Sequence, residues 1–254
     1  MPLLRFVRDT QRRSSLLAGA ALVALSATAA HATSLTVNAA AAIYDAGNTS
    51  PVYGATLPPS ISLSAGTTSV TFGSITGSLT CASSEGCVTI NGYGSLNDAD
   101  GNYSATSSSS NSGTSSISGI VAPGAGYLVG LFVAGTVPSG SAPSALDFTS
   151  IGTSFASLSP LLDQTFFIGD GLTGNGTGTT QVFNVPSGAT TLYLGISDAC
   201  GYNGGPGCYG DNFGSFVVPV TLHSGTAVPE PASLALLSAG LIVLCLGVRR
   251  RSPG

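Results

Sequence analysis

The chain has 254 residues and a formal net charge of −4 at pH 7, and all of its cationic side chains are arginines within residues 1–13 and 249–251. The stretch between these ends contains no lysine or arginine. Apart from Glu230 near the C-terminal end, its charged residues are Asp45, Glu85, Asp98, Asp100, Asp147, Asp163, Asp170, Asp198 and Asp211. Because binding to nucleic acid depends on Lys and Arg side chains that displace counterions, we exclude nucleic acid as a partner.

A carboxylate buried in this central stretch has no lysine or arginine to neutralise it. It must stay solvated, shift its pKa or bind a metal ion. The stretch is rich in Gly, Ser and Thr, which is typical of disordered chains, but Val, Ile, Leu and Phe recur at regular intervals. This spacing favours one packed all-β domain over disorder.

Residues 1–32 have the parts of a secretory signal peptide. Arg12 and Arg13 precede an apolar run over residues 16–25, and Ala30-His31-Ala32 has the small-x-small pattern that signal peptidase recognises. We therefore predict export with cleavage after Ala32. The alternative is an uncleaved N-terminal anchor, although the apolar run is short for a membrane-spanning helix.

Residues 33–64 are predicted to be a leader or a first strand, and residues 65–227 a single domain. Strand-like apolar or alternating runs occur at 69–72, 115–121, 127–134, 166–169, 180–185, 190–197 and 215–222. Short strands without convincing helices favour an antiparallel β-sandwich. Pro219 in the last run predicts a sheet edge or a bulge there.

Two polar segments of the domain are predicted to be surface loops. The low-complexity stretch 104–116 reads as a flexible loop. Asp98, Asp100 and Asn102 alternate like the first ligands of an EF-hand, but Tyr103 replaces the required glycine and Ser109 the bidentate Glu. We interpret residues 98–102 as a solvated turn.

Four cysteines form two close pairs in the sequence. Export makes disulfides chemically reasonable, and we expect local pairing of Cys81 with Cys87 and of Cys200 with Cys208 among three possible connectivities. A zinc site is the alternative. Neither pair has CxxC spacing, and His223 is the only histidine after the predicted cleavage site.

The glycine-rich segment 198–216 joins the two most regular predicted strands. It places Asp198, Asn203, Asp211 and Asn212 at one end of the domain. Calcium takes about six to eight oxygen ligands from carboxylates, amides and backbone carbonyls, and a disulfide-closed loop can hold such oxygens in place. The alternative is that these side chains stabilise turns without a metal.

This segment resembles the C-terminal hairpin of the PA-IL family of bacterial galactose-binding lectins. The matching residues are Thr191-Leu192, Asp198, Tyr209-Gly210, Asp211-Asn212 and Gly214-Ser215-Phe216. The resemblance implies a lectin-like β-sandwich in which Asp198, Asp211, Asn212 and the backbone carbonyl of Cys208 bind Ca²⁺. Sugar hydroxyls would complete the shell beside Asp198, Asp211 and Asn212. The loop from Asp198 to Cys208 is longer than in those lectins, and no histidine matches the one that contacts their sugar.

The chain ends with Pro229-Glu230-Pro231, an apolar stretch at 232–248 and the basic tail Arg249-Arg250-Arg251. The apolar stretch is long enough, at about 25 Å, to span the hydrocarbon core as a helix, and the basic tail should remain cytoplasmic. Residues 228–254 resemble the PEP-CTERM sorting signal of Gram-negative bacteria. This implies an inner-membrane intermediate, cleavage by an exosortase-type enzyme, and release to the outer surface or exopolysaccharide matrix. The alternative is an ordinary tail anchor.

These patterns predict an exported, non-enzymatic protein that binds extracellular polysaccharide with the help of calcium. No GxSxG or comparable nucleophile pattern is present. The main alternative is a structural surface or matrix protein without a specific ligand. A third is a glycan-cleaving enzyme, which would release reducing ends.

Overall fold

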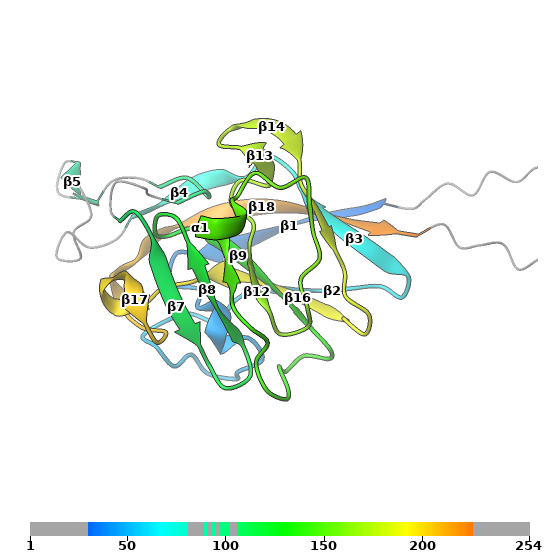
Figure 1. Ribbon diagram of the computed structural model, residues 1–254, viewed down its shortest axis with the longest axis horizontal. Helices are drawn as coiled ribbons and strands as arrows, with labels where there is room; N and C mark the ends of the chain where they lie inside the picture. The colour runs from blue at the N-terminus through cyan, green and yellow to red at the C-terminus, as the bar shows by residue number, and fades with distance from the viewer. Residues whose placement is uncertain (1–29, 81–88, 91–92, 95–96, 102–105, 226–254) are drawn as a thin grey trace, which may run out of the picture.

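The computed structural model describes residues 30–80, 89–90, 93–94, 97–101 and 106–225 (Figure 1). The predicted pair Cys81 and Cys87 lies outside the described residues. So do most of the predicted signal peptide and the whole of the predicted sorting segment with its helix at 232–248. Within the described residues, no helix has the length and apolar character needed to cross a membrane.

Among the described residues, the prediction of an all-β domain is confirmed. The strands are β1 (Ala30–Asn38), β2 (Ser60–Ser62), β3 (Thr67–Phe72), β4 (Thr76–Thr80), β5 (Thr89–Ile90), β6 (Tyr93–Gly94), β7 (Ser109–Gly113), β8 (Ser118–Ala122), β9 (Leu128–Val133), β10 (Leu146–Asp147), β11 (Ser157–Leu158), β12 (Thr165–Phe167), β13 (Leu172–Gly174), β14 (Thr177–Thr180), β15 (Val182–Asn184), β16 (Thr191–Ile196), β17 (Asn203–Gly204) and β18 (Phe213–Ser224). The helical elements are short: α1 (Phe148–Ile151) and the 3₁₀ turns η1 (Ile43–Asp45), η3 (Cys200–Tyr202) and η4 (Tyr209–Asp211).

The strands form three larger sheets and two small hairpins. The largest sheet has the order β1-β18-β3-β15-β11, with β4 also paired to β18, and the others run β10-β8-β7-β17 and β12-β9-β16-β2. Most pairs are antiparallel, as predicted, but β8–β10, β11–β15 and β7–β17 are parallel. Each parallel pair includes a two-residue strand from a long connection, and segments this short carry no sequence signal for their direction.

Strand β18 lies inside the largest sheet, with partners on both sides. Along one side it pairs with the whole of β1, and along the other with β4 and then β3. The prediction of a sheet edge at Pro219 is wrong, but the alternative, a bulge, agrees with the pairing: residues 73–75 lie opposite residues 218–219, between the pairs Phe72–Val220 and Thr76–Val217. Pro219 lies where the second partner changes from β4 to β3, and its carbonyl accepts a hydrogen bond from the Gly73 N–H (2.9 Å). Its missing N–H falls between the paired segments 213–217 and 220–224, where this side of the ladder is interrupted.

Two segments without a strong apolar pattern are nevertheless ordered. The stretch predicted as a leader or first strand forms most of β1, which begins earlier, at Ala30 of the predicted signal peptide. It continues into the buried residues Ala39, Ala41, Ala42 and Ile43. The prediction of a flexible loop at 104–116 is wrong where β7 forms. Its Ser109 and Asn111 are buried because Ser109 Oγ bonds to Tyr127 Oη (3.0 Å) and Asn111 Nδ2 donates to the Asp198 carbonyl (2.6 Å).

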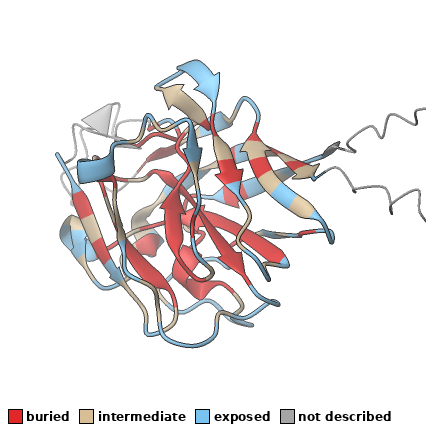
Figure 2. Ribbon diagram, turned by 45° about the vertical axis from the view of Figure 1, so that its right-hand side comes forward, coloured by how far each residue is buried: buried red, intermediate tan, exposed pale blue. Residues whose placement is uncertain are grey.

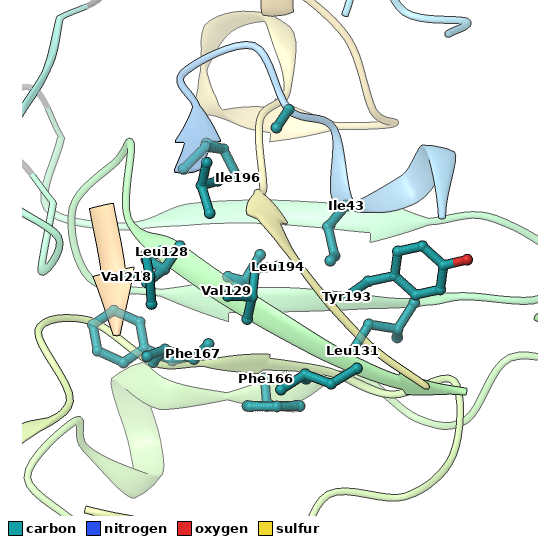
Figure 3. Packing of buried hydrophobic residues seen from close by; sticks show 14 of the residues in the cluster. Ile43, Leu128, Val129, Leu131, Phe166, Phe167, Tyr193, Leu194, Ile196 and Val218 are labelled. Atoms are coloured by element: carbon teal, nitrogen blue, oxygen red, sulfur yellow. The ribbon is translucent and has the colours of Figure 1, made fainter. Parts of the chain in front are cut away.

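The core lies between the largest sheet and the β12-β9-β16-β2 sheet (Figure 2). Strands β9 and β16 are buried along their whole length, and Figure 3 shows their aliphatic side chains gathered with Phe166 and Phe167. Phe166 of β12 stacks on Phe132 (5.1 Å between ring centroids) and contacts Phe183 of β15 (5.3 Å). Because Phe166 and Phe183 belong to different sheets, their contact joins the two layers.

We expect Phe166→Ala to lower the free energy of unfolding by about 3–5 kcal/mol, because it leaves a cavity between the two sheets. Phe213→Ala, which truncates a side chain that is 58% exposed, should change it by about 0.5 kcal/mol or less. Urea unfolding followed by circular dichroism measures both. Equal losses in the two variants would contradict this view of the core.

Asp100 is buried, so the prediction of a fully solvated turn at 98–102 is wrong for this residue. Only 6% of it is exposed. Its Oδ1 accepts a hydrogen bond from the Asp170 N–H (3.0 Å), and its buried Oδ2 has no hydrogen-bond partner among the described residues. Burial, with a smaller effect from the nearby carboxylates of Asp170 and Asp98, raises the pKa of Asp100 to about 6.

This pKa predicts that stability falls as Asp100 ionises. The folded state holds the proton up to about pH 6, whereas the unfolded chain releases it near pH 4. The group therefore contributes stability at low pH that is lost as the pH rises through about 6. As the pH rises from 4 to 7, the free energy of unfolding of Asp100→Asn should increase by about 1–2 kcal/mol relative to that of the parent. Urea unfolding measured across this range checks the prediction; parallel profiles for Asp100→Asn and the parent would contradict the assignment.

Candidate functional site

The predicted glycine-rich loop lies at the end of the molecule opposite the point where the chain enters β1 and leaves β18 (Figure 1). Asp198 follows β16, and the chain passes through η3, β17 and η4 before it enters β18. The predicted disulfide between Cys200 and Cys208 is present, with a Cα–Cα distance of 5.1 Å. It closes the part of the loop that includes three residues with left-handed backbone, Gly201 (φ 65°), Tyr202 (φ 66°) and Cys208 (φ 64°).

Contacts with distant strands hold the loop in place. β17 pairs with β7, and Asn111 of β7 donates to the Asp198 carbonyl (2.6 Å). Beneath the loop, the fully buried Tyr209 donates its hydroxyl proton to the Ile196 carbonyl (3.0 Å) and accepts from the Asp198 N–H (3.0 Å). Burial raises the pKa of Tyr209 well above its ordinary value, so the hydroxyl remains a donor. The position of Asp198 is therefore fixed from two sides.

The structure brings the four predicted metal-binding residues to one pocket. Asp198, Cys208, Asp211 and Asn212 all line it, whereas Asn203 is exposed on β17. The other lining residues are Leu79, Thr80, Asn97, Ala125, Gly126, Ala199 and Tyr202. The space among them opens to solvent and is about 20 Å³, which is room for a water molecule or a single ion.

Asn97 is a pocket residue that the sequence analysis did not find. It is 6% exposed, and an antiparallel backbone bridge to Leu79 fixes it there (N–H to O distances of 2.7 and 3.0 Å). Its Nδ2 donates to the Ala125 carbonyl (3.4 Å), but its buried Oδ1 has no hydrogen-bond partner among the described residues. A buried amide oxygen without a partner is costly, and it is satisfied if a ligand or ion supplies the contact.

The hydrogen bonds of Asp198 show how the carboxylate is oriented. Its Oδ1 accepts from the Ala199 N–H (2.8 Å), and its Oδ2 accepts from Asn212 Nδ2 (2.7 Å). In this arrangement Asn212 directs its nitrogen toward Asp198. A cation shared by both residues would require the Asn212 amide to turn its oxygen inward.

The oxygen atoms around the pocket are of types that calcium accepts as ligands. Asp198 and Asp211 offer carboxylates, Asn97 and Asn212 offer amide oxygens, and Cys208 has a backbone carbonyl. Within the part of the chain that the structure describes, no cluster of three or more His, Cys, Asp or Glu side chains could hold a metal. A metal here would therefore depend on amide and carbonyl oxygens as much as on carboxylates.

A smaller polar pocket adjoins the first. Ser109, Ser110, Asn111 and Ser197 line it, and it shares Ala125, Asp198, Ala199 and Tyr202 with the larger pocket. Hydroxyl and amide groups thus continue from the Asp198 carboxylate toward β7. Such a surface suits a ligand that carries many hydroxyl groups.

Comparison with known protein families matches residues 227–251 to the PEP-CTERM protein-sorting motif. The match includes Pro229, Glu230, Pro231 and the basic tail Arg249, Arg250 and Arg251. No curated protein and no solved structure matches the chain, so these comparisons do not support the resemblance to the PA-IL lectins. The sorting motif implies processing by an exosortase-type enzyme, and the protein is exported through the membrane to the cell surface.

Proposed function

We propose that this exported protein binds extracellular polysaccharide through a calcium ion in the pocket around Asp198, and that its two packed sheets form a lectin-like β-sandwich. One observation carries the proposal: the carboxylate and amide residues that sequence reasoning selected line a single pocket, and Asn97, whose buried Oδ1 has no hydrogen-bond partner among the described residues, lines it too. A cation or a sugar hydroxyl would supply the contact that Asn97 Oδ1 lacks.

The charge of the domain supports a cation as the ligand. Asp198 and Asp211 line the same pocket, and no lysine or arginine occurs among the described residues to neutralise them. A divalent cation would offset the repulsion between the two carboxylates. Calcium suits the site because it accepts amide and backbone oxygens in irregular geometry and leaves coordination positions for a sugar diol.

The position of the pocket suits a surface-binding role. β18 begins beside Asn212 and ends at Ser224, close to the sorting motif. A strand of twelve residues spans about 40 Å at roughly 3.3 Å per residue. The pocket therefore lies at the end of β18 that is farther, along the chain, from the segment that the membrane would hold.

A structural surface or matrix protein without a specific ligand is the second candidate. It is favoured by the hydrogen bonds that already satisfy Asp198 and by the disulfide, Tyr209 and β17, which hold the loop without a metal. The two candidates differ in whether calcium stabilises the fold and whether the protein is retained on sugar.

We expect calcium to raise the melting temperature of the purified exported protein and EGTA to reverse the rise. A ligand that binds only the folded state adds about 2.7 kcal/mol at a hundred times its dissociation constant. Asn97→Ala should weaken the shift and Asp198→Ala should abolish it, whereas Asn184→Ala removes an exposed amide elsewhere and should leave it intact. Differential scanning calorimetry provides the measurement. No shift at millimolar calcium would favour the structural protein.

Calcium-dependent retention on a sugar resin tests the carbohydrate part. We expect retention with calcium, elution with EGTA and no retention of Asp198→Ala. If Asp198→Ala were still retained in a calcium-dependent manner, the site assignment would be wrong. Release of reducing ends from the polysaccharide would instead indicate an enzyme.

Glu230→Ala tests the sorting step. The variant should accumulate in the inner-membrane fraction with its C-terminal segment intact, because the enzyme that cleaves near the motif no longer recognises it. Fractionation followed by mass spectrometry reads both location and mass. Glu85→Ala removes the only other glutamate and should be released like the parent; release of Glu230→Ala at the parent's mass would contradict the assignment.

A further inference from the structure

The longest outer strand among the described residues is β1. It has nine residues and ends the order of the largest sheet. The strands at the other ends of the three larger sheets, β2, β10, β11, β12 and β17, have two or three residues each. The outer side of β4 is partly covered by the bridge between Leu79 and Asn97. β1 therefore presents the longest row of backbone groups without a partner strand in the described part of the chain.

The hydrogen-bond pattern shows which backbone groups of β1 face away from β18. The Ala39 N–H donates to the Gly214 carbonyl (3.0 Å), and backbone groups alternate sides along a strand. The odd-numbered residues of β1 therefore bond to β18, and Ser34 and Thr36 direct their N–H and C=O groups outward. Pro219 agrees with this pattern, because it lies opposite Ser34 and its carbonyl bonds to Gly73 instead.

β1 lacks the features that usually block pairing at a sheet edge. Its sequence has no proline and no acidic or basic side chain other than His31, and its register with β18 is continuous from Ala30 to Asn38. The side chains of Ser34 and Thr36 are small and exposed. Natural edge strands are normally protected by lysine, proline, a bulge or short length.

We propose that β1 pairs antiparallel with β1 of a second copy of this chain, about a two-fold axis at Leu35. Ser34 then lies opposite Thr36 of the second copy, and each such pair exchanges two backbone hydrogen bonds. A second copy fits because the same two residues supply both donors and acceptors, so the edge is complementary to itself. Both residues lie after the predicted cleavage site, so the processed chain keeps residues 33–38 of β1 and with them this part of the edge.

The pairing goes beyond the proposed function because the dimer carries two Asp198 pockets instead of one. Antiparallel pairing reverses one copy relative to the other, so the two Asp198 pockets lie toward opposite ends of the dimer. Such a particle can link two polysaccharide chains, and two linked sites raise the avidity for a repeating ligand. The two chain exits also point in opposite directions, so the dimer forms after release from the membrane.

Sedimentation velocity of the processed exported protein over a wide concentration series tests the pairing. We expect a dimer that dissociates on dilution. Thr36→Pro removes an outward N–H without removing a bond to β18, and Ser34→Lys adds a charge at the edge. Both variants should be monomers at concentrations where the parent is a dimer. Thr179→Lys, which adds the same charge on the β13–β14 hairpin, should behave like the parent.

A parent that is monomeric at every concentration would overturn the proposal. So would a dimer that persists in Ser34→Lys, or a mass that corresponds to one copy bound to a different molecule. If Thr36→Pro lowers the melting temperature, Ser34→Lys decides, because it leaves the backbone unchanged.

Discussion

The pairing of β18 with three other strands is the constraint on which the rest of the structure depends. β18 joins the first described strand to β3 and β4, and its buried residues Phe216, Val218, Val220 and Leu222 form one side of the core. The same strand begins at the candidate site and ends at the approach to the sorting motif. The fold, the orientation of the pocket and the exposed edge at β1 all follow from this one strand.

The candidate site lies beside the start of β18, and contacts between segments far apart in the sequence form it. Asn97 reaches the pocket through its bridge to Leu79, and Tyr209 supports Asp198 from below through its hydroxyl group. The disulfide shortens the free length of the loop, so little ordering remains for a ligand to induce. The loop is therefore pre-formed, and Asn97 beside it has an amide oxygen whose hydrogen bonding is unsatisfied.

Regular apolar patterns allowed the main strands to be predicted. Segments that are held in place by long-range contacts could not be predicted in this way. The run at 190–197 became β16 because its side chains are apolar along the whole stretch. Asp198, Asp211 and Asn212 could be selected because they flank a glycine-rich connection between two such strands. β7 could not be predicted, because its serines are buried through hydrogen bonds rather than apolar packing. Asn97 had no local signal, since only the fold brings it to the pocket.

The most direct test of the calcium site is its stoichiometry, measured by isothermal titration of the purified, metal-free exported protein with Ca²⁺. The account predicts one ion for each chain, with binding lost in Asp198→Ala and weakened in Asn97→Ala. No binding heat at any calcium concentration tested, or equal binding in Asp198→Ala and the parent, would contradict it.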